Sequence, residues 1–128
     1  MIDILKKFNS FNLLKGNFGI EREMLRVDRD GELSKKPHPK AFGDKLNNPY
    51  ITTDFSESQI EVITPPMPTV KETHNFLSTL YDITALECKD EYLWPQSMPC
   101  IVPDDKDIPL AEFNDTEKGI ESRKYREK

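Results

Sequence analysis

The stretch FGIEREMLRVDRDGELS, residues 18–34, predicts a strand, a tight turn and a short return strand. The pattern from Phe18 to Val27 is that of a β-strand. Asp28-Arg29-Asp30-Gly31 follows as a turn, because glycine supplies the permissive backbone that a tight turn needs. Residues 32–34 can then return as an antiparallel partner.

Further along the chain, residues 50–55 and 58–64 predict a second strand pair, or one strand bent at Ser56-Glu57. The intervening stretch 35–49 contains three prolines and a glycine without periodicity, so we expect a loop there. Prolines at positions 65, 66 and 68 end any strand, since proline has no N–H to donate to a sheet.

The clearest helix signal begins at Thr69-Val70-Lys71-Glu72, which has the pattern of a capping box. Apolar residues continue at helical spacing beyond it, and they predict a helix from about residue 69 to residue 89. A second, short amphipathic helix is expected between Ile2 and Gly16. Strands and helices that follow in separate runs indicate the α+β class, with helices packed on an antiparallel sheet.

Two carboxylates, Glu21 and Glu23, project from the same face of the first strand, with Cα atoms about 6.6 Å apart. They would repel by roughly 2.5 kcal/mol at an effective dielectric constant of 20, and by about 0.6 kcal/mol in open water. Arg22 and Arg26 point to the other face of a regular strand. A divalent cation would therefore offset the repulsion. The alternative is an ordinary solvated sheet face, on which charged residues two apart are common.

Further acids, Asp54, Glu57 and Glu61, lie in the second strand region, and in extended geometry Glu57, Gln59 and Glu61 share one face. If the two strands are neighbours, three or more carboxylates converge. Oxygen ligands without sulfur and with little histidine suit Mg²⁺ or Mn²⁺ better than Zn²⁺. Magnesium often shares its ligand shell with substrate phosphates, which indicates nucleotide chemistry.

The overall composition of the 128 residues limits the possible partners. Eighteen Lys and Arg residues are outnumbered by 23 Asp and Glu, for a net charge of -5, which argues against a nucleic-acid partner. No apolar run reaches the ~18 residues that span a bilayer. The two cysteines, Cys88 and Cys100, fit no metal or redox spacing, so we expect a cytoplasmic protein with packed thiols. On composition alone, residues 103–128 read as a solvated tail.

Several blocks, in the same order, resemble the N-terminal part of bacterial glutamate–cysteine ligase (γ-glutamylcysteine synthetase). These blocks are GIEREMLRVDRDGELS (19–34), His38-Pro39, ITTDFSESQIEVITP (51–65), WPQSMPC (94–100), PLAEF (109–113) and YRE (125–127). Their number and order make the resemblance specific.

The resemblance implies a fold like the catalytic domain of glutamine synthetase, with an antiparallel sheet curved around the site. It implies that ATP activates the γ-carboxylate of glutamate as a γ-glutamyl phosphate, which the amine of cysteine then attacks. Mg²⁺ or Mn²⁺ would bridge the phosphates. The residues implied are Glu21, Glu23, Glu61 and Asp54 for the metal, Phe55, Tyr125 and Glu61 for cysteine, and Arg126 as a catalytic contact to phosphate or substrate.

Family members run to several hundred residues, so residues 1–128 correspond to the N-terminal portion of a single catalytic domain. The highly charged stretch from residue 103 onwards is then an internal segment that lacks its packing partners. We expect the chain alone to be inactive or nearly so. A monofunctional ligase and the front of a bifunctional glutathione-synthesising enzyme both remain open, as does an inert fragment or acidic metal-binding module.

Overall fold

The computed structural model describes residues 15–127. All but the last two positions of the helix expected between Ile2 and Gly16 lie outside the described residues.

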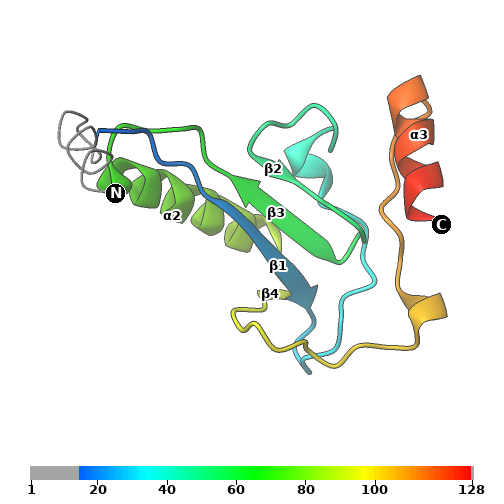
Figure 1. The fold of residues 1–128 in the computed structure, drawn as a ribbon. Coiled ribbons are helices and arrows are strands. Elements are labelled where there is room, and N and C mark those ends of the chain that lie inside the picture. Colours follow the sequence, from blue (N-terminus) through cyan, green and yellow to red (C-terminus); the bar gives the residue numbers. More distant parts are fainter. Residues whose placement is uncertain (1–14, 128) are drawn as a thin grey trace, which may run out of the picture.

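The described chain forms one four-stranded antiparallel sheet with two α-helices, which confirms the α+β class (Figure 1). The strand order is β2-β3-β1-β4. The elements are β1 (Glu21–Val27), η1 (Lys40–Phe42), β2 (Ile51–Thr52), β3 (Gln59–Ile63), α2 (Val70–Glu87), β4 (Tyr92–Leu93), η2 (Asp105–Asp107) and α3 (Glu117–Arg126), where η marks a short 3-10 helix.

The two long strands are neighbours, which is the condition on which the sequence made the convergence of the acids depend. β1 runs antiparallel to β3, with Glu23 opposite Glu61 and Leu25 opposite Gln59. After β1 the chain turns at Gly31, whose φ of 83° favours glycine. The return strand expected at residues 32–34 is reduced to an isolated bridge to Val27.

Helix α2 covers one face of the sheet and forms the main core with it (Figure 1). Met24, Ile60 and Val62 alternate inward from β1 and β3 and contact Leu80 and Phe76 of α2. Ile60 and Val62 are completely buried. Because side chains of a strand alternate, the residues between these positions face away from α2. The opposite face of the sheet therefore carries the residues that the sequence singled out for chemistry.

The start of α2 has the expected cap in a slightly different form. Thr69 Oγ1 accepts a hydrogen bond from the backbone N–H of Glu72 at 3.2 Å, as a capping residue should. The reciprocal bond differs, because the Thr69 hydroxyl itself donates to the Glu72 carboxylate at 2.7 Å.

The charged segment that begins at Pro103 is not a solvated tail, so the expectation from composition is wrong. Its backbone is hydrogen-bonded to the rest of the chain, from Glu57 N–H to the Pro109 carbonyl (2.9 Å) and from Ala111 N–H to the Phe55 carbonyl (3.0 Å). The segment passes the sheet and ends in α3, which lies away from α2 (Figure 1). The segment has few apolar side chains, so hydrogen bonds between backbone groups hold it against the rest of the chain.

Arg26 joins these parts of the fold from inside the molecule. Its side chain is fully buried and forms an ion pair with Glu91 at 2.8 Å. Its guanidinium also donates to the backbone carbonyls of Glu57 and Lys36, both at 2.6 Å, and of Pro37 at 3.2 Å. One arginine thus ties β1 to three loops. Within residues 15–127, no helix is long and apolar enough to cross a membrane.

Candidate metal and substrate site

Three carboxylates lie on the sheet face that α2 leaves open. Glu21 and Glu23 project from β1, and Glu61 projects from β3 directly opposite Glu23. Arg22 faces the other way, since its guanidinium lies 5.6 Å from the ring centroid of Tyr81 on α2. The strand pairing therefore brings the three predicted acids to one face and turns the neighbouring arginine away from them.

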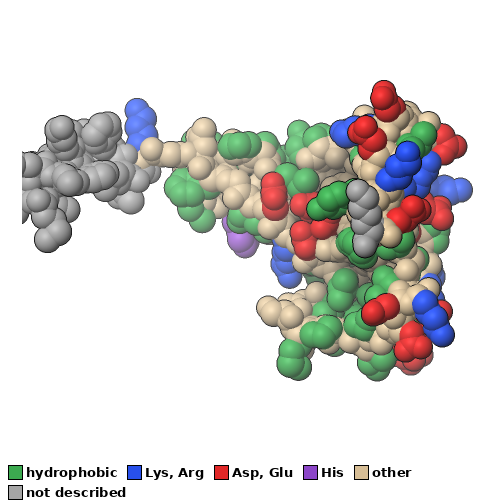
Figure 2. All heavy atoms as spheres, turned by 45° about the vertical axis from the view of Figure 1, so that its right-hand side comes forward, with side chains coloured by type: hydrophobic (Ala, Val, Ile, Leu, Met, Phe, Trp, Pro, Cys, Tyr) green, Lys and Arg blue, Asp and Glu red, His purple; other side chains and the backbone are tan. Residues whose placement is uncertain are grey.

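The electrostatics of this face are unfavourable for Glu61. Its pKa is raised above the usual range by partial burial and then by the charges of Glu23, Glu21 and Asp54. Within residues 15–127, none of Glu21, Glu23 and Glu61 forms an ion pair. Figure 2 shows one group of acidic side chains near the middle of the molecule and further acidic ones to the right, where most of the basic side chains in that view also lie. The carboxylates of this face therefore repel one another.

The chemistry of the donor set fits Mg²⁺ or Mn²⁺, because it consists of carboxylate oxygens on adjacent strands. The fit is incomplete. Among the described residues, no three His, Cys, Asp or Glu side chains lie close enough together to hold a metal ion as they stand. The assignment of a metal ion to this face therefore stays a prediction.

Asp54, also expected as a metal ligand, forms an ion pair with Arg126 of α3. It lies in the turn between β2 and β3, and its Oδ1 is 3.5 Å from Nη2 of Arg126. The Arg126 Nε–H donates to the Asp54 carbonyl at 2.5 Å, and the guanidinium stacks on Phe113 at 4.6 Å. The two residues hold the end of α3 against the β2–β3 turn. Their roles at a metal or phosphate stay predictions.

The two aromatic residues assigned to the cysteine substrate are exposed. Phe55 is 50% exposed in the β2–β3 turn, and Tyr125 is 78% exposed on α3. No contact between their rings is found in the described part of the chain. Phe55 follows Asp54 in the chain, and Tyr125 precedes Arg126. The Asp54–Arg126 ion pair therefore sets the positions of the β2–β3 turn and of α3 relative to each other.

Two hollows adjoin the carboxylate face. One, of about 510 Å³, is mostly apolar and is lined by Leu25, Phe55 and Leu110, among others. The other, of about 310 Å³, has Glu23 and Gln59 on one side and the loop from Trp94 to Pro99 on the other.

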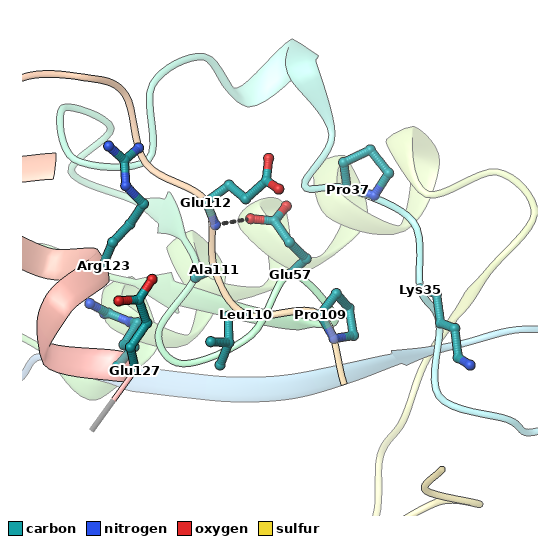
Figure 3. Close-up of a pocket in the computed structure, with 10 residues that line it drawn as sticks. Lys35, Pro37, Glu57, Pro109, Leu110, Ala111, Glu112, Arg123 and Glu127 are labelled. Carbon is teal, nitrogen blue, oxygen red and sulfur yellow. Dashed lines mark hydrogen bonds between the residues drawn. The ribbon is translucent and has the colours of Figure 1, made fainter. Parts of the chain in front are cut away.

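A buried network around Glu57 was not foreseen. The sequence placed Glu57 on the same face as Glu61, yet its carboxylate is buried and pairs with Lys45. It also accepts from the backbone N–H groups of His38 (2.5 Å) and Glu112 (2.6 Å). Figure 3 shows the Glu112 bond beside a pocket of about 560 Å³, with α3 on the far side.

The Glu57 carboxyl keeps a lowered pKa. Burial alone would raise it, and the hydrogen bonds from Lys45 and from the two backbone groups outweigh that effect. The departure from strand alternation begins here, because Glu57 precedes β3 and is not part of it. The sequence allowed a bend at Ser56-Glu57 as one alternative, but the spacing of residues could not show that the Glu57 carboxylate is buried.

The family model described as glutamate–cysteine ligase matches residues 2–128. The chain belongs to this family. Among curated members of the glutamate–cysteine ligase family, the bifunctional glutathione biosynthesis protein GshAB of Desulfotalea psychrophila is 53% identical over 114 residues, which cover 88% of this chain and 15% of that protein. The glutamate–cysteine ligase of Clostridium acetobutylicum is 49% identical over 120 residues, 94% of this chain and 25% of the relative.

Solved structures agree with this assignment. The chain is similar to a glutamate–cysteine ligase from Francisella tularensis in complex with AMP, with a TM-score of 0.83 and 38% identity over 88% of this chain and 23% of that one. A bifunctional glutathione synthetase from Pasteurella multocida gives a TM-score of 0.78 and 36% identity over 88% of this chain and 16% of that one. The chain spans a quarter or less of the length of these relatives.

Proposed function

We propose that this chain supplies the N-terminal part of a catalytic domain that joins the γ-carboxylate of L-glutamate to the amine of L-cysteine with ATP. This is the first step of glutathione biosynthesis. Family membership supports the reaction, and the AMP complex of the Francisella relative supports a nucleotide as co-substrate. Whether the parent protein is monofunctional or bifunctional is left open by relatives of both kinds.

The observation that carries the proposal is the pairing of Glu23 with Glu61 across two strands, with Glu21 beside them. We assign these three carboxylates, with Asp54 as a weaker candidate, to Mg²⁺ or Mn²⁺. A metal held there would neutralise the phosphates of ATP and of the γ-glutamyl phosphate. The chain's own part is to keep several negative charges together on a rigid sheet, where they are costly unless a cation joins them.

The substrate residues of the proposal lie around that face. Phe55 would line the cysteine pocket from the β2–β3 turn and Tyr125 from α3, with Glu61 close to the amine. Arg126 would contact phosphate or substrate after exchanging its bond to Asp54. The exposed side chains of Phe55 and Tyr125 are compatible with this role, because an aromatic surface that contacts a ligand must be reachable.

The 128 residues alone should have little or no ligase activity. They span a quarter or less of the relatives, and their carboxylates do not complete a metal cage among the described residues. An acidic module that binds metal weakly is the second candidate, and the same two observations favour it. ADP release with glutamate, cysteine and Mg-ATP tests the point; turnover close to that of a full-length family member would contradict it.

Metal affinity tests the site itself. The unmodified chain should bind Mn²⁺, and Glu23→Gln should lose most of that affinity, as measured by calorimetry. Glu87→Gln is the matched control, because Glu87 is an exposed residue of α2, on the other side of the sheet. Absence of Mn²⁺ binding, or equal loss in both variants, would refute the metal site.

A cytoplasmic location is the remaining part of the proposal. Cys88 and Cys100 are both free and buried, as suits a reducing compartment.

A further inference from the structure

Gln59 occupies a position that the proposed reaction does not yet use. It is the first residue of β3, two positions before Glu61, so both side chains lie on the open face of the sheet. Leu25 is its direct partner on β1, and Glu23 is its diagonal neighbour. Diagonal neighbours on one face are within reach of a long side chain.

The amide of Gln59 makes two hydrogen bonds in opposite directions. Its Nε2 donates to Oε2 of Glu23 at 2.7 Å. Its Oε1 accepts from the backbone N–H of Phe55 at 3.2 Å. Because a carboxylate only accepts and a backbone N–H only donates, these two partners allow a single orientation of the amide. One side chain thereby links a candidate metal ligand to the turn that carries a candidate substrate contact.

The Gln59 amide, which donates to Glu23, carries no charge. Elsewhere in the fold a carboxylate is held by a cation, as Glu57 is by Lys45. A lysine at position 59 would neutralise Glu23 and compete with any metal. An amide instead restrains the carboxylate and leaves its full negative charge in place.

We propose that Gln59 is a positioning residue, which orients the Glu23 carboxylate for a divalent cation and couples it to the Asp54–Phe55 turn. The inference rests on the proposed function, because it presumes that Glu23 binds metal. Hydrogen-bond partners of metal ligands fix the ligand orientation, and their loss typically weakens metal affinity by about 10- to 100-fold. Both Glu23 and Gln59 line the 310 Å³ hollow, so the bond between them adjoins space that a ligand can enter.

The test uses Gln59→Leu, which removes both hydrogen bonds at similar volume, with Gln59→Met as a second variant should the first not fold. Mn²⁺ affinity is measured by calorimetry, and hydrogen exchange of the Phe55 amide is measured by NMR on the metal-free chain. Gln96→Leu is the matched control, because Gln96 lines the same hollow but makes no hydrogen bond to Glu23 within the described residues.

We expect Mn²⁺ affinity to fall by about 10- to 100-fold in the Gln59 variants. The Phe55 amide should exchange about threefold to tenfold faster, as for loss of one hydrogen bond. The melting temperature and the Gln96→Leu control should stay close to the unmodified chain, which separates positioning from a loss of fold.

Unchanged Mn²⁺ affinity in a folded Gln59 variant would overturn this inference and leave the proposed function standing. A failure of the unmodified chain to bind Mn²⁺ would overturn the proposed function, and the inference with it. The two failures are distinguished by the protein in which they occur.

Discussion

Replacing Glu61 by glutamine should stabilise the metal-free chain, although it removes a residue proposed to be functional. Glu61 lies opposite Glu23 on the sheet, and Glu21 and Asp54 add to the negative potential around it. Glutamine has nearly the same shape as glutamate and carries no charge. The substitution therefore removes the repulsion and keeps the packing.

The size of the effect follows from the strand register. Directly opposed side chains have Cβ atoms about 4.5–5.5 Å apart. Two charges about 5.5 Å apart repel by about 3 kcal/mol at an effective dielectric constant of 20 and by about 0.8 kcal/mol in water. Glu23 is exposed and Glu61 half-buried, so the lower end applies. We expect a gain of about 1 kcal/mol in the free energy of unfolding, or about 4 °C in melting temperature.

The gain should depend on pH with a defined sign. Burial and the neighbouring acids raise the pKa of Glu61 in the folded chain above its usual value of 4.5. The folded state thus keeps a proton that the unfolded chain has released, and stability falls as pH rises from about 4.5 through the raised pKa. Glutamine at this position does not titrate, so the Glu61→Gln protein does not show this decrease in stability. The two proteins should melt at similar temperatures near pH 4 and differ fully at pH 7.

Thermal melts followed by circular dichroism, with chelator present, measure this difference. Glu87→Gln serves as the control for loss of one negative charge at a distance from the face. A melting temperature at pH 7 that is unchanged or lower in Glu61→Gln would show that the carboxylates do not repel one another, and the basis for a metal site there would be gone.

Three further substitutions or titrations probe the rest of the fold. A Cβ added to Gly119 would lie 2.0 Å from the Asn114 carbonyl oxygen, so Gly119→Ala should destabilise the chain by about 1–3 kcal/mol, seen as a lower urea midpoint. Arg26→Met leaves the buried Glu91 unpaired and should cost about 3–5 kcal/mol in the same assay. Burial, then Lys45 and Arg26, lowers the pKa of His38 to about 4, so its ring should titrate there by NMR. The unfolded chain takes up a proton on His38 at a higher pH than the folded chain does. The free energy of unfolding therefore decreases as pH falls from 6.5 towards 4.

Neighbouring exposed residues provide the controls for these experiments. Lys118→Ala, next to Gly119, and Arg29→Met, on the surface turn after β1, should leave the urea midpoint nearly unchanged. A midpoint equal to the unmodified chain in Gly119→Ala or Arg26→Met would contradict the packing described for that residue. A ring of His38 that titrates near 6.5 would contradict its burial. The His38 effect is common to the unmodified chain and Glu61→Gln, so it cancels in their difference.

Local patterns were enough to predict the main elements. Alternation over residues 18–27 indicated β1, and the Thr69–Glu72 cap with its apolar stripe indicated α2, because both signals depend on residues close in sequence. The convergence of Glu23 and Glu61 followed from assuming that the two strands are neighbours. The register that places them directly opposite each other came only with the structure.

Contacts between distant segments could not be predicted in this way. Composition made residues 103–128 look solvated, yet backbone hydrogen bonds and the contact of Arg126 with Asp54 hold the segment in place. Such bonds leave no trace in hydrophobic periodicity. Glu57 likewise looked like a member of the acidic face, and only the pairing with Lys45 explains its burial. The assignment of Asp54 to metal came from resemblance alone, which carries no information on local geometry.

The most direct test of the central claim is to locate a bound cation on the folded chain. Mn²⁺ broadens the NMR signals of nuclei near it, so titration of the isotopically labelled chain maps its position. We predict the strongest broadening at the backbone amides of Glu21, Glu23 and Glu61, and none along the outer face of α2. Broadening spread evenly over the acidic surface, or strongest at α3, would contradict a metal site on the open face of the sheet.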